Sequence, residues 1–228
     1  MDDSAQIGTT PADPPSPNLL VRVVQVFVSP GALFDSLKRR PVWIDAMLLL
    51  IALGVAAQLL IPEETLRRVM EAQLPAGSDP AQLDKIVGIA RKWGVAIAAI
   101  TTPISVAAVA GLLMLAYNVI LGGEATFRQL FSATTHAFLI LTAGGFLVLG
   151  LVLTGSDQVV ISPALLLPDL GNGYLARFAY RINLFAIWNS VVLGIAVSRI
   201  YPKRSAGGAT AYLLVLYAMV VAVSALRA

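Results

Sequence analysis

The sequence predicts an all-α membrane protein that crosses the bilayer five times. Five apolar stretches carry this prediction, because each is close to the 20 or so residues that a helix needs to cross a hydrocarbon core about 30 Å thick. Of the 228 residues, 57% are hydrophobic and only 13% are charged, whereas a soluble domain carries about 25% charged residues. The apolar runs do not alternate with polar residues, so they predict helices rather than barrel strands. The predicted spans are residues 42–61, 94–121, 130–153, 182–200 and 209–225.

Residues 1–17 are predicted to form a disordered polar tail, and residues 18–228 a single membrane domain. The tail contains four prolines, three aspartates and no basic residue. A secretory signal would begin with basic residues and then become apolar, so we expect no cleavage and an insertion signal in the first span. The chain has no cysteine, which excludes disulfides, thiolate metal ligands and thiol catalysis.

Two short amphipathic interfacial helices are predicted before the first span. Asn18 can cap the first helix, which carries leucine, valine and phenylalanine on one side and Arg22 and Gln25 on the other. Ser29 and Pro30 are typical of the cap and first turn of the second helix. Such helices can lie in the headgroup layer or pack on the loops of the protein itself, and both arrangements remain open.

Basic and aromatic residues at the start of the first span indicate its orientation. Cations at the phosphate level and an interfacial tryptophan act as anchors, and cationic ends stay in the cytoplasm. Basic residues of the complete loops are equal in number on the two sides, so the prediction depends on the short flanks. We therefore expect a cytoplasmic amino terminus, with the anchors Lys38, Arg39, Arg40 and Trp43.

The two longest connections have different expected structures. Residues 62–93 combine two amphipathic segments around a Pro/Gly-rich break, which predicts a solvated or interfacial helical hairpin. Asp79 can cap the second of these helices, which continues into the second span. Residues 154–181 contain prolines and a Gly-Asn-Gly sequence, so we expect irregular structure that rests on the bundle.

Polar residues inside the spans are few and neutral, with His136 the only histidine of the chain. A proton or metal site would need a carboxylate or second ligand near His136, and the sequence offers no such spacing. We therefore favour a histidine that hydrogen-bonds a neighbouring helix. Asn118 and Asn189 are interpreted as interhelical hydrogen-bonding residues in preference to ligand contacts. No catalytic motif, metal site or cofactor site is found, so an enzyme is not expected.

Small residues at four-residue spacing indicate close helix packing. Ser190, Gly194 and Ser198 form such a ridge on the fourth span. Ridges of this kind let helix backbones approach closely in a membrane. The same ridges are compatible with a homo-oligomer or with packing that is complete within one chain.

Three separated motifs resemble the Yip family, membrane proteins named for their interaction with Ypt/Rab GTPases, and particularly its bacterial branch. They are VFVSPGALFDSLKRRPVWIDAMLLL (26–50), LGGEATFRQLF (121–131) and NLFAIWNSVVLGIAVSRIY (183–201). Their order and spacing cover residues 19–226. The resemblance implies a five-span fold with a cytosolic amino terminus, here in a bacterial cytoplasmic membrane. In the second motif, Gly122 and Gly123 allow a tight reversal between the second and third spans.

The leading hypothesis is a non-enzymatic adaptor, scaffold or membrane organiser, whose partners are the lipid bilayer and a membrane protein or second copy. In eukaryotic relatives the resemblance implies vesicle traffic, through partner binding and membrane shaping. The short pre-membrane segment lacks the long cytosolic domain of those relatives, so GTPase binding is not expected. The spread of basic residues also disfavours nucleic acid. The alternative is a small-molecule or lipid transporter or channel that uses Asn118, His136, Asn189 and a kink at Pro103.

Overall fold

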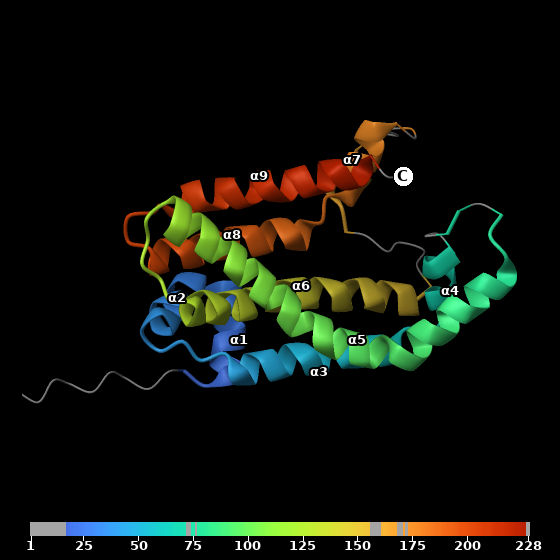
Figure 1. Cartoon of the computed structure of the whole chain (residues 1–228), viewed down its shortest axis with the longest axis horizontal. Helices are drawn as coiled ribbons and strands as arrows, with labels where there is room; N and C mark the ends of the chain where they lie inside the picture. Colours follow the sequence, from blue (N-terminus) through green and yellow to red (C-terminus); the bar gives the residue numbers. More distant parts are fainter. Residues whose placement is uncertain are drawn as a thin grey trace, which may run out of the picture.

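The computed structural model describes residues 17–71, 74–75, 77–155, 161–167, 171 and 173–226, so the predicted tail lies outside the described residues except for Pro17. These residues are mostly helical, and they contain no strand (Figure 1). The elements are α1 (Leu19–Val28), α2 (Pro30–Arg39), α3 (Ile44–Leu60), α4 (Glu63–Glu71), α5 (Pro80–Met114), the π-helical segment η1 (Leu115–Ile120), α6 (Phe127–Leu153), the 3-10 turn η2 (Pro163–Leu166), α7 (Tyr174–Arg181), α8 (Leu184–Ile200) and α9 (Ala206–Ala225).

Three to five helical units of the described chain are long and apolar enough to cross a membrane. The continuous helix Pro80–Ile120, α6 and α9 each meet this description alone. Helices α3 and α8 meet it when joined to α4 and α7, from which they are bent by 93° and 59°. The prediction of an all-α polytopic membrane protein is therefore confirmed. Each of the five predicted spans overlaps one of these helices.

The second span belongs to an unusually long helix. It begins at the cap Asp79, whose carboxylate accepts a hydrogen bond from the Ala81 amide. It then runs without interruption through Pro103 into the π-helical segment η1, for 41 residues in total. The π-helical end was not predicted, because the sequence pattern does not separate a π turn from an α turn. Helix α7 was also not predicted, since the proline and glycine residues around it indicated irregular structure.

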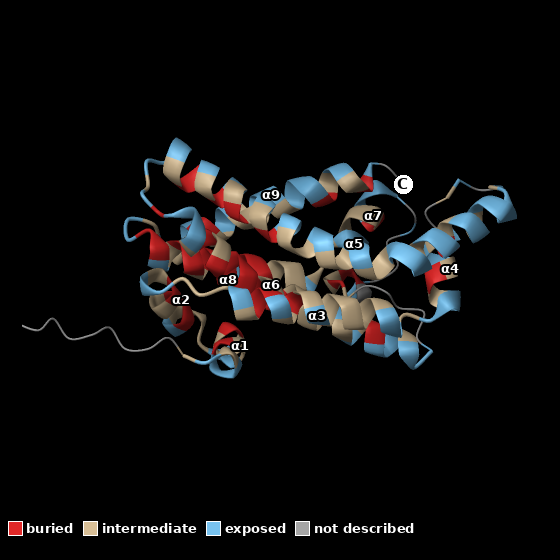
Figure 2. Ribbon diagram, turned by 60° about the horizontal axis from the view of Figure 1, so that its bottom comes forward, coloured by how far each residue is buried: buried red, intermediate tan, exposed pale blue. Residues whose placement is uncertain are grey.

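The long helices lie roughly along one axis, and the short ones gather at its two ends (Figure 1). Helices α1 and α2 lie at the same end as the α5–α6 and α8–α9 connections, whereas α4 and α7 lie at the other end. Helix α6 is central and contacts α1, α2, α3, α5 and α8. Buried residues accordingly concentrate on α6 and α8, while α5 and α9 expose much of their surface (Figure 2).

The two amino-terminal helices dock on the bundle in different ways. Helix α2 buries Leu33, Phe34 and Leu37 and packs against α8, where Asp35 forms a salt bridge with Arg199 at 3.4 Å. Its apolar side therefore packs on the protein. Helix α1 is apolar on both sides, because its inner side buries Val26 together with Arg22 and its outer side exposes leucine and valine.

Candidate functional site

The principal polar site lies where α1, α3 and α6 meet, and Arg22 of α1 is its centre. The residue is only 3% exposed, on a side of α1 that the sequence pattern describes as polar. Its guanidinium forms an ion pair with Asp45 of α3 through Nη2. Its Nη1 lies 3.0 Å from Nε2 of His136, and its Nε donates to the Pro17 carbonyl at 2.9 Å. Three partners compensate the burial of this cation.

The surroundings of His136 define its tautomer. Its Nδ1 lies 2.8 Å from the Ser132 carbonyl, which can only accept a hydrogen bond. Its Nε2 faces the Arg22 guanidinium, which can only donate. The imidazole is therefore neutral, donates through Nδ1 and accepts through Nε2. Both ring nitrogens are occupied within the protein.

Asp45 supplies the carboxylate of this cluster and is joined to His136 through Arg22. The spacing of the two residues in the sequence did not indicate this connection. It stands in the first turn of α3, where its Oδ1 accepts a hydrogen bond from the Ala46 amide at 2.9 Å. A cavity of about 550 Å³ opens beside it and is lined by the start of α1, the start of α3 and Arg128. One signal in the sequence could have indicated this ion pair. Asp45 is a single carboxylate at the start of a span, and such a carboxylate needs a cation that another segment has to supply.

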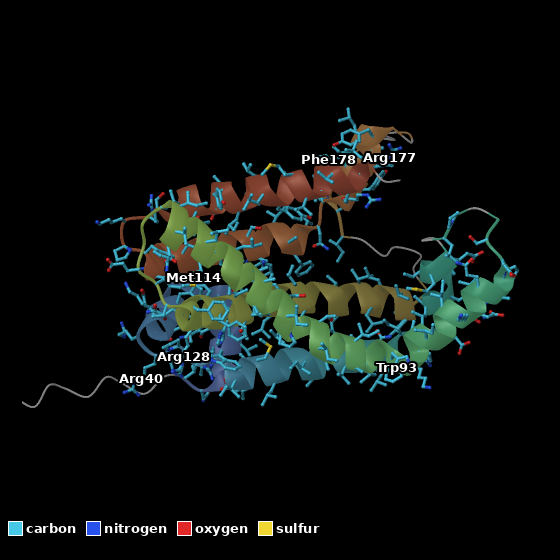
Figure 3. All side chains as sticks on the ribbon, in the orientation of Figure 1. Arg40, Trp93, Met114, Arg128, Arg177 and Phe178 are labelled. Carbon is cyan, nitrogen blue, oxygen red and sulfur yellow. The ribbon has the colours of Figure 1, made fainter. Side chains whose placement is uncertain are left out.

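Helix α6 also holds the connection between α2 and α3. Gln129 donates to the Lys38 carbonyl at 2.8 Å, and Ser132 donates to the Val42 carbonyl at 2.7 Å. The Trp43 ring stands edge-on to Phe131, with 5.0 Å between the ring centroids. Of the predicted anchors, Lys38 and Trp43 are half-buried and Arg39 and Arg40 are exposed. Figure 3 shows Arg40 and Arg128 at this end of the bundle, far from Arg177 and Phe178.

Asn118 organises a second polar site at the α5–α6 turn. Its side chain donates to the Ala125 carbonyl at 2.7 Å and accepts from the Ala125 amide at 3.2 Å. The Tyr201 hydroxyl donates to the same amide oxygen of Asn118 at 2.6 Å. Three segments thus meet at Asn118: the π-helical end of α5, the turn, and the end of α8.

Both glycines of the turn occupy positions that other residues would strain. Gly122 has a φ of +68°, in the left-handed region that favours glycine. A Cβ atom on Gly123 would lie 2.7 Å from the Tyr117 carbonyl oxygen and 2.5 Å from the Tyr201 ring. Burial, together with the adjacent Tyr117, raises the pKa of the Tyr201 phenol to about 12. The phenol therefore remains a hydrogen-bond donor over the physiological pH range.

The predicted residues of α8 serve packing and do not join the other two sites. Gly194 faces α9, and a Cβ atom there would lie 2.7 Å from the Thr210 backbone nitrogen. The Ser190 and Ser198 hydroxyls donate to carbonyls of their own helix. Asn189 is 8% exposed and its Oδ1 has no hydrogen-bond partner within the described part of the chain. It is about 18 Å along α8 from Tyr201, the partner of Asn118.

No group of three or more His, Asp or Glu side chains in the described ranges could hold a metal ion. The polar sites instead connect helices to one another. The helices and these sites define an all-α integral membrane protein. At one end, α1, α2 and the α5–α6 and α8–α9 connections are joined by hydrogen bonds to the bundle, and we call this end the platform. The family model of the Yip1 domain matches residues 24–226, and the chain therefore belongs to the Yip family. No curated protein and no solved structure matches the chain.

Proposed function

We propose that the protein is a non-enzymatic membrane organiser, which holds amphipathic helices at one membrane surface and presents them to lipids and membrane partners. The observation that carries this proposal is the exposed apolar outer side of α1. Leu20 and Val28 are 76% and 73% exposed on its outer side, while Arg22 faces the bundle. A helix with apolar residues outward is suited to lie against lipid.

The Arg22 contacts support the same role, because they fix this outer side relative to the spans. The ion pair with Asp45 and the hydrogen bond to His136 hold α1 on α3 and α6. The basic residues at this end, Lys38, Arg39, Arg40, Lys203 and Arg204, favour a cytoplasmic location for the platform. The alanine-rich spans favour a bacterial cytoplasmic membrane.

A transporter or channel is the second candidate, and the polar contacts disfavour it. The side chains of Asn118 and His136 are used in hydrogen bonds within the protein, and Asn189 lies about 18 Å along α8 from Tyr201, the partner of Asn118. A transport path would require polar groups that can exchange partners with a substrate. Solute flux through proteoliposomes that disappears in both Asn118→Leu and His136→Leu would favour transport over organisation.

The test of the organiser role changes only the outer side of α1. The variant Leu20→Asn/Val24→Asn/Val28→Asn should insert and fold, because these side chains are exposed and do not contribute to the core. In a deletion strain, the wild-type chain should restore the lipid and protein composition of the membrane, and this variant should not. The matched control Leu166→Asn/Leu175→Asn changes exposed leucines at the opposite end and should restore it.

Two results would contradict the proposal. One is a deletion strain whose membrane composition equals that of the parent strain. The other is full restoration by the α1 variant, which would show that the outer side of α1 has no part in the function.

A further inference from the structure

A second cavity lies at the platform end, outside the cluster of Arg22, Asp45 and His136. Its volume is about 450 Å³, and it lies between the α5–α6 turn and the α8–α9 connection. We call it the cationic cavity, because Lys38, Lys203 and Arg204 line it together with a single acidic residue, Glu124.

The cations of this cavity are available for a ligand. Within the part of the chain that the structure describes, neither the Lys38 nor the Lys203 ammonium has an ion-pair partner. Arg204 donates one N–H to the Leu121 carbonyl at 2.7 Å, which fixes its position and leaves further donors. The cavity therefore has an excess of positive charge and directed hydrogen-bond donors.

The frame of the cavity is held in place by the second polar site. The Asn118 side chain forms hydrogen bonds with Ala125 and Tyr201, and both residues line the cavity. Gln129 holds the backbone of Lys38. Because these contacts exist without a ligand, binding needs little further ordering of the protein.

The apolar part of the lining indicates what kind of anion fits. Leu121 directly follows the apolar helix of the second span, and Ile200 is the last residue of α8. Cations thus stand beside apolar side chains at the level where the spans end. This combination suits an amphiphile, with its phosphate on the cations and its glycerol and first acyl carbons beside the leucine and isoleucine.

We propose that the cationic cavity is a specific binding site for an anionic phospholipid, whose phosphate contacts Lys38, Lys203 and Arg204. Basic pockets between membrane helices bind anionic headgroups in this way. The site would bind lipid whether or not the protein recruits membrane partners, so its failure and that of the organiser role are distinguishable.

The test measures lipid binding by the full chain, purified in detergent, with native mass spectrometry. The probes are phosphatidylglycerol, phosphatidylcholine of the same acyl chains, and inorganic phosphate. Each lysine near a headgroup contributes about fivefold in affinity, so Lys38→Gln/Lys203→Gln should bind phosphatidylglycerol about 25-fold more weakly than wild type. Arg204 is left unchanged because it also holds the turn.

The matched control is Lys85→Gln/Lys92→Gln. It removes two exposed lysines from the part of α5 that extends toward the opposite end of the bundle. It should bind like wild type. Glu124→Gln removes the anion of the cavity and should bind more tightly than wild type. The proposal is overturned if Lys38→Gln/Lys203→Gln keeps its preference for phosphatidylglycerol, if the control loses as much affinity, or if inorganic phosphate displaces the lipid at equal concentration.

Discussion

At the junction of α1, α3 and α6, one guanidinium uses its N–H groups for three different segments. Arg22 donates to the Pro17 backbone, to the Asp45 carboxylate and to the His136 imidazole. These residues are 5, 23 and 114 positions away in the sequence. The tautomer of His136 follows from the same arrangement, because the Ser132 carbonyl occupies the other nitrogen.

This cluster could not be predicted from the sequence. Sequence periodicity reports which side of a helix is apolar, and it assigned Arg22 to the opposite, polar side. It cannot report that a cation on α1 meets a carboxylate on α3 and a histidine on α6. By contrast, the strain at Gly122 was predictable, since a two-glycine turn between two long apolar runs requires a tight reversal.

Replacement of Arg22 by methionine should destabilise the protein by about 1–3 kcal/mol. Methionine keeps the apolar stem, but the change leaves Nε2 of His136 without a donor and Asp45 without its cation. The measurement is the free energy of unfolding in detergent. Arg39→Met, which removes an exposed cation of α2, should change it by less than about 0.5 kcal/mol.

The same measurement can isolate the pair interaction. Asp45→Asn keeps an acceptor for the Ala46 amide and removes the charge. The loss of unfolding free energy in the double variant Arg22→Met/Asp45→Asn should be smaller than the summed losses of the two single variants, by about 1 kcal/mol or more. Strict additivity would show that the ion pair does not hold α1.

At the scale of the elements, the sequence determines most helices locally. Continuous apolar runs and caps such as Asn18 and Asp79 predicted the positions of α1, α3, α5, α6, α8 and α9. The π-helical segment η1 and α7 were not predictable by these means. The π turn brings Tyr117 and Asn118 against Tyr201, and that partner is 83 positions away.

The close contact between α8 and α9 requires a glycine at position 194, because there is no room for a Cβ atom there. Gly194→Ala should destabilise the protein by about 1–3 kcal/mol, because its Cβ would meet the backbone of Thr210, which no rotamer change can move. The thermal unfolding midpoint in detergent should fall accordingly. Gly207→Ala in α9 meets no atom within 4 Å, so it should leave the midpoint unchanged or raise it slightly. An unchanged midpoint for Gly194→Ala would mean that the two helices are not in close contact.

At the scale of the whole molecule, the predicted five-span topology places the platform and the 62–93 connection on opposite sides of the membrane, because the first span separates them. The natural sequence has no cysteine, so each introduced cysteine is unique. Arg39→Cys and Lys203→Cys should react with an impermeant maleimide from the cytoplasmic side only. Lys85→Cys should react from the other side only. Labelling of all three from one side would contradict the five-span topology.

The length of the α5–η1 helix has a consequence for the kind of bilayer that the protein tolerates. At about 1.5 Å per residue, the part between Trp93 and Ile120 measures about 40 Å, against a hydrocarbon core of about 30 Å. Trp93 is exposed at the start of this part, and tryptophan is enriched where spans meet the membrane interface. The helix crosses the bundle diagonally (Figure 1), and hydrophobic mismatch is normally relieved by such tilt. A thin bilayer should therefore increase the tilt of this helix from the membrane normal, and a thick bilayer should reduce it. The length of the lipid chains would in this way change the geometry of the bundle.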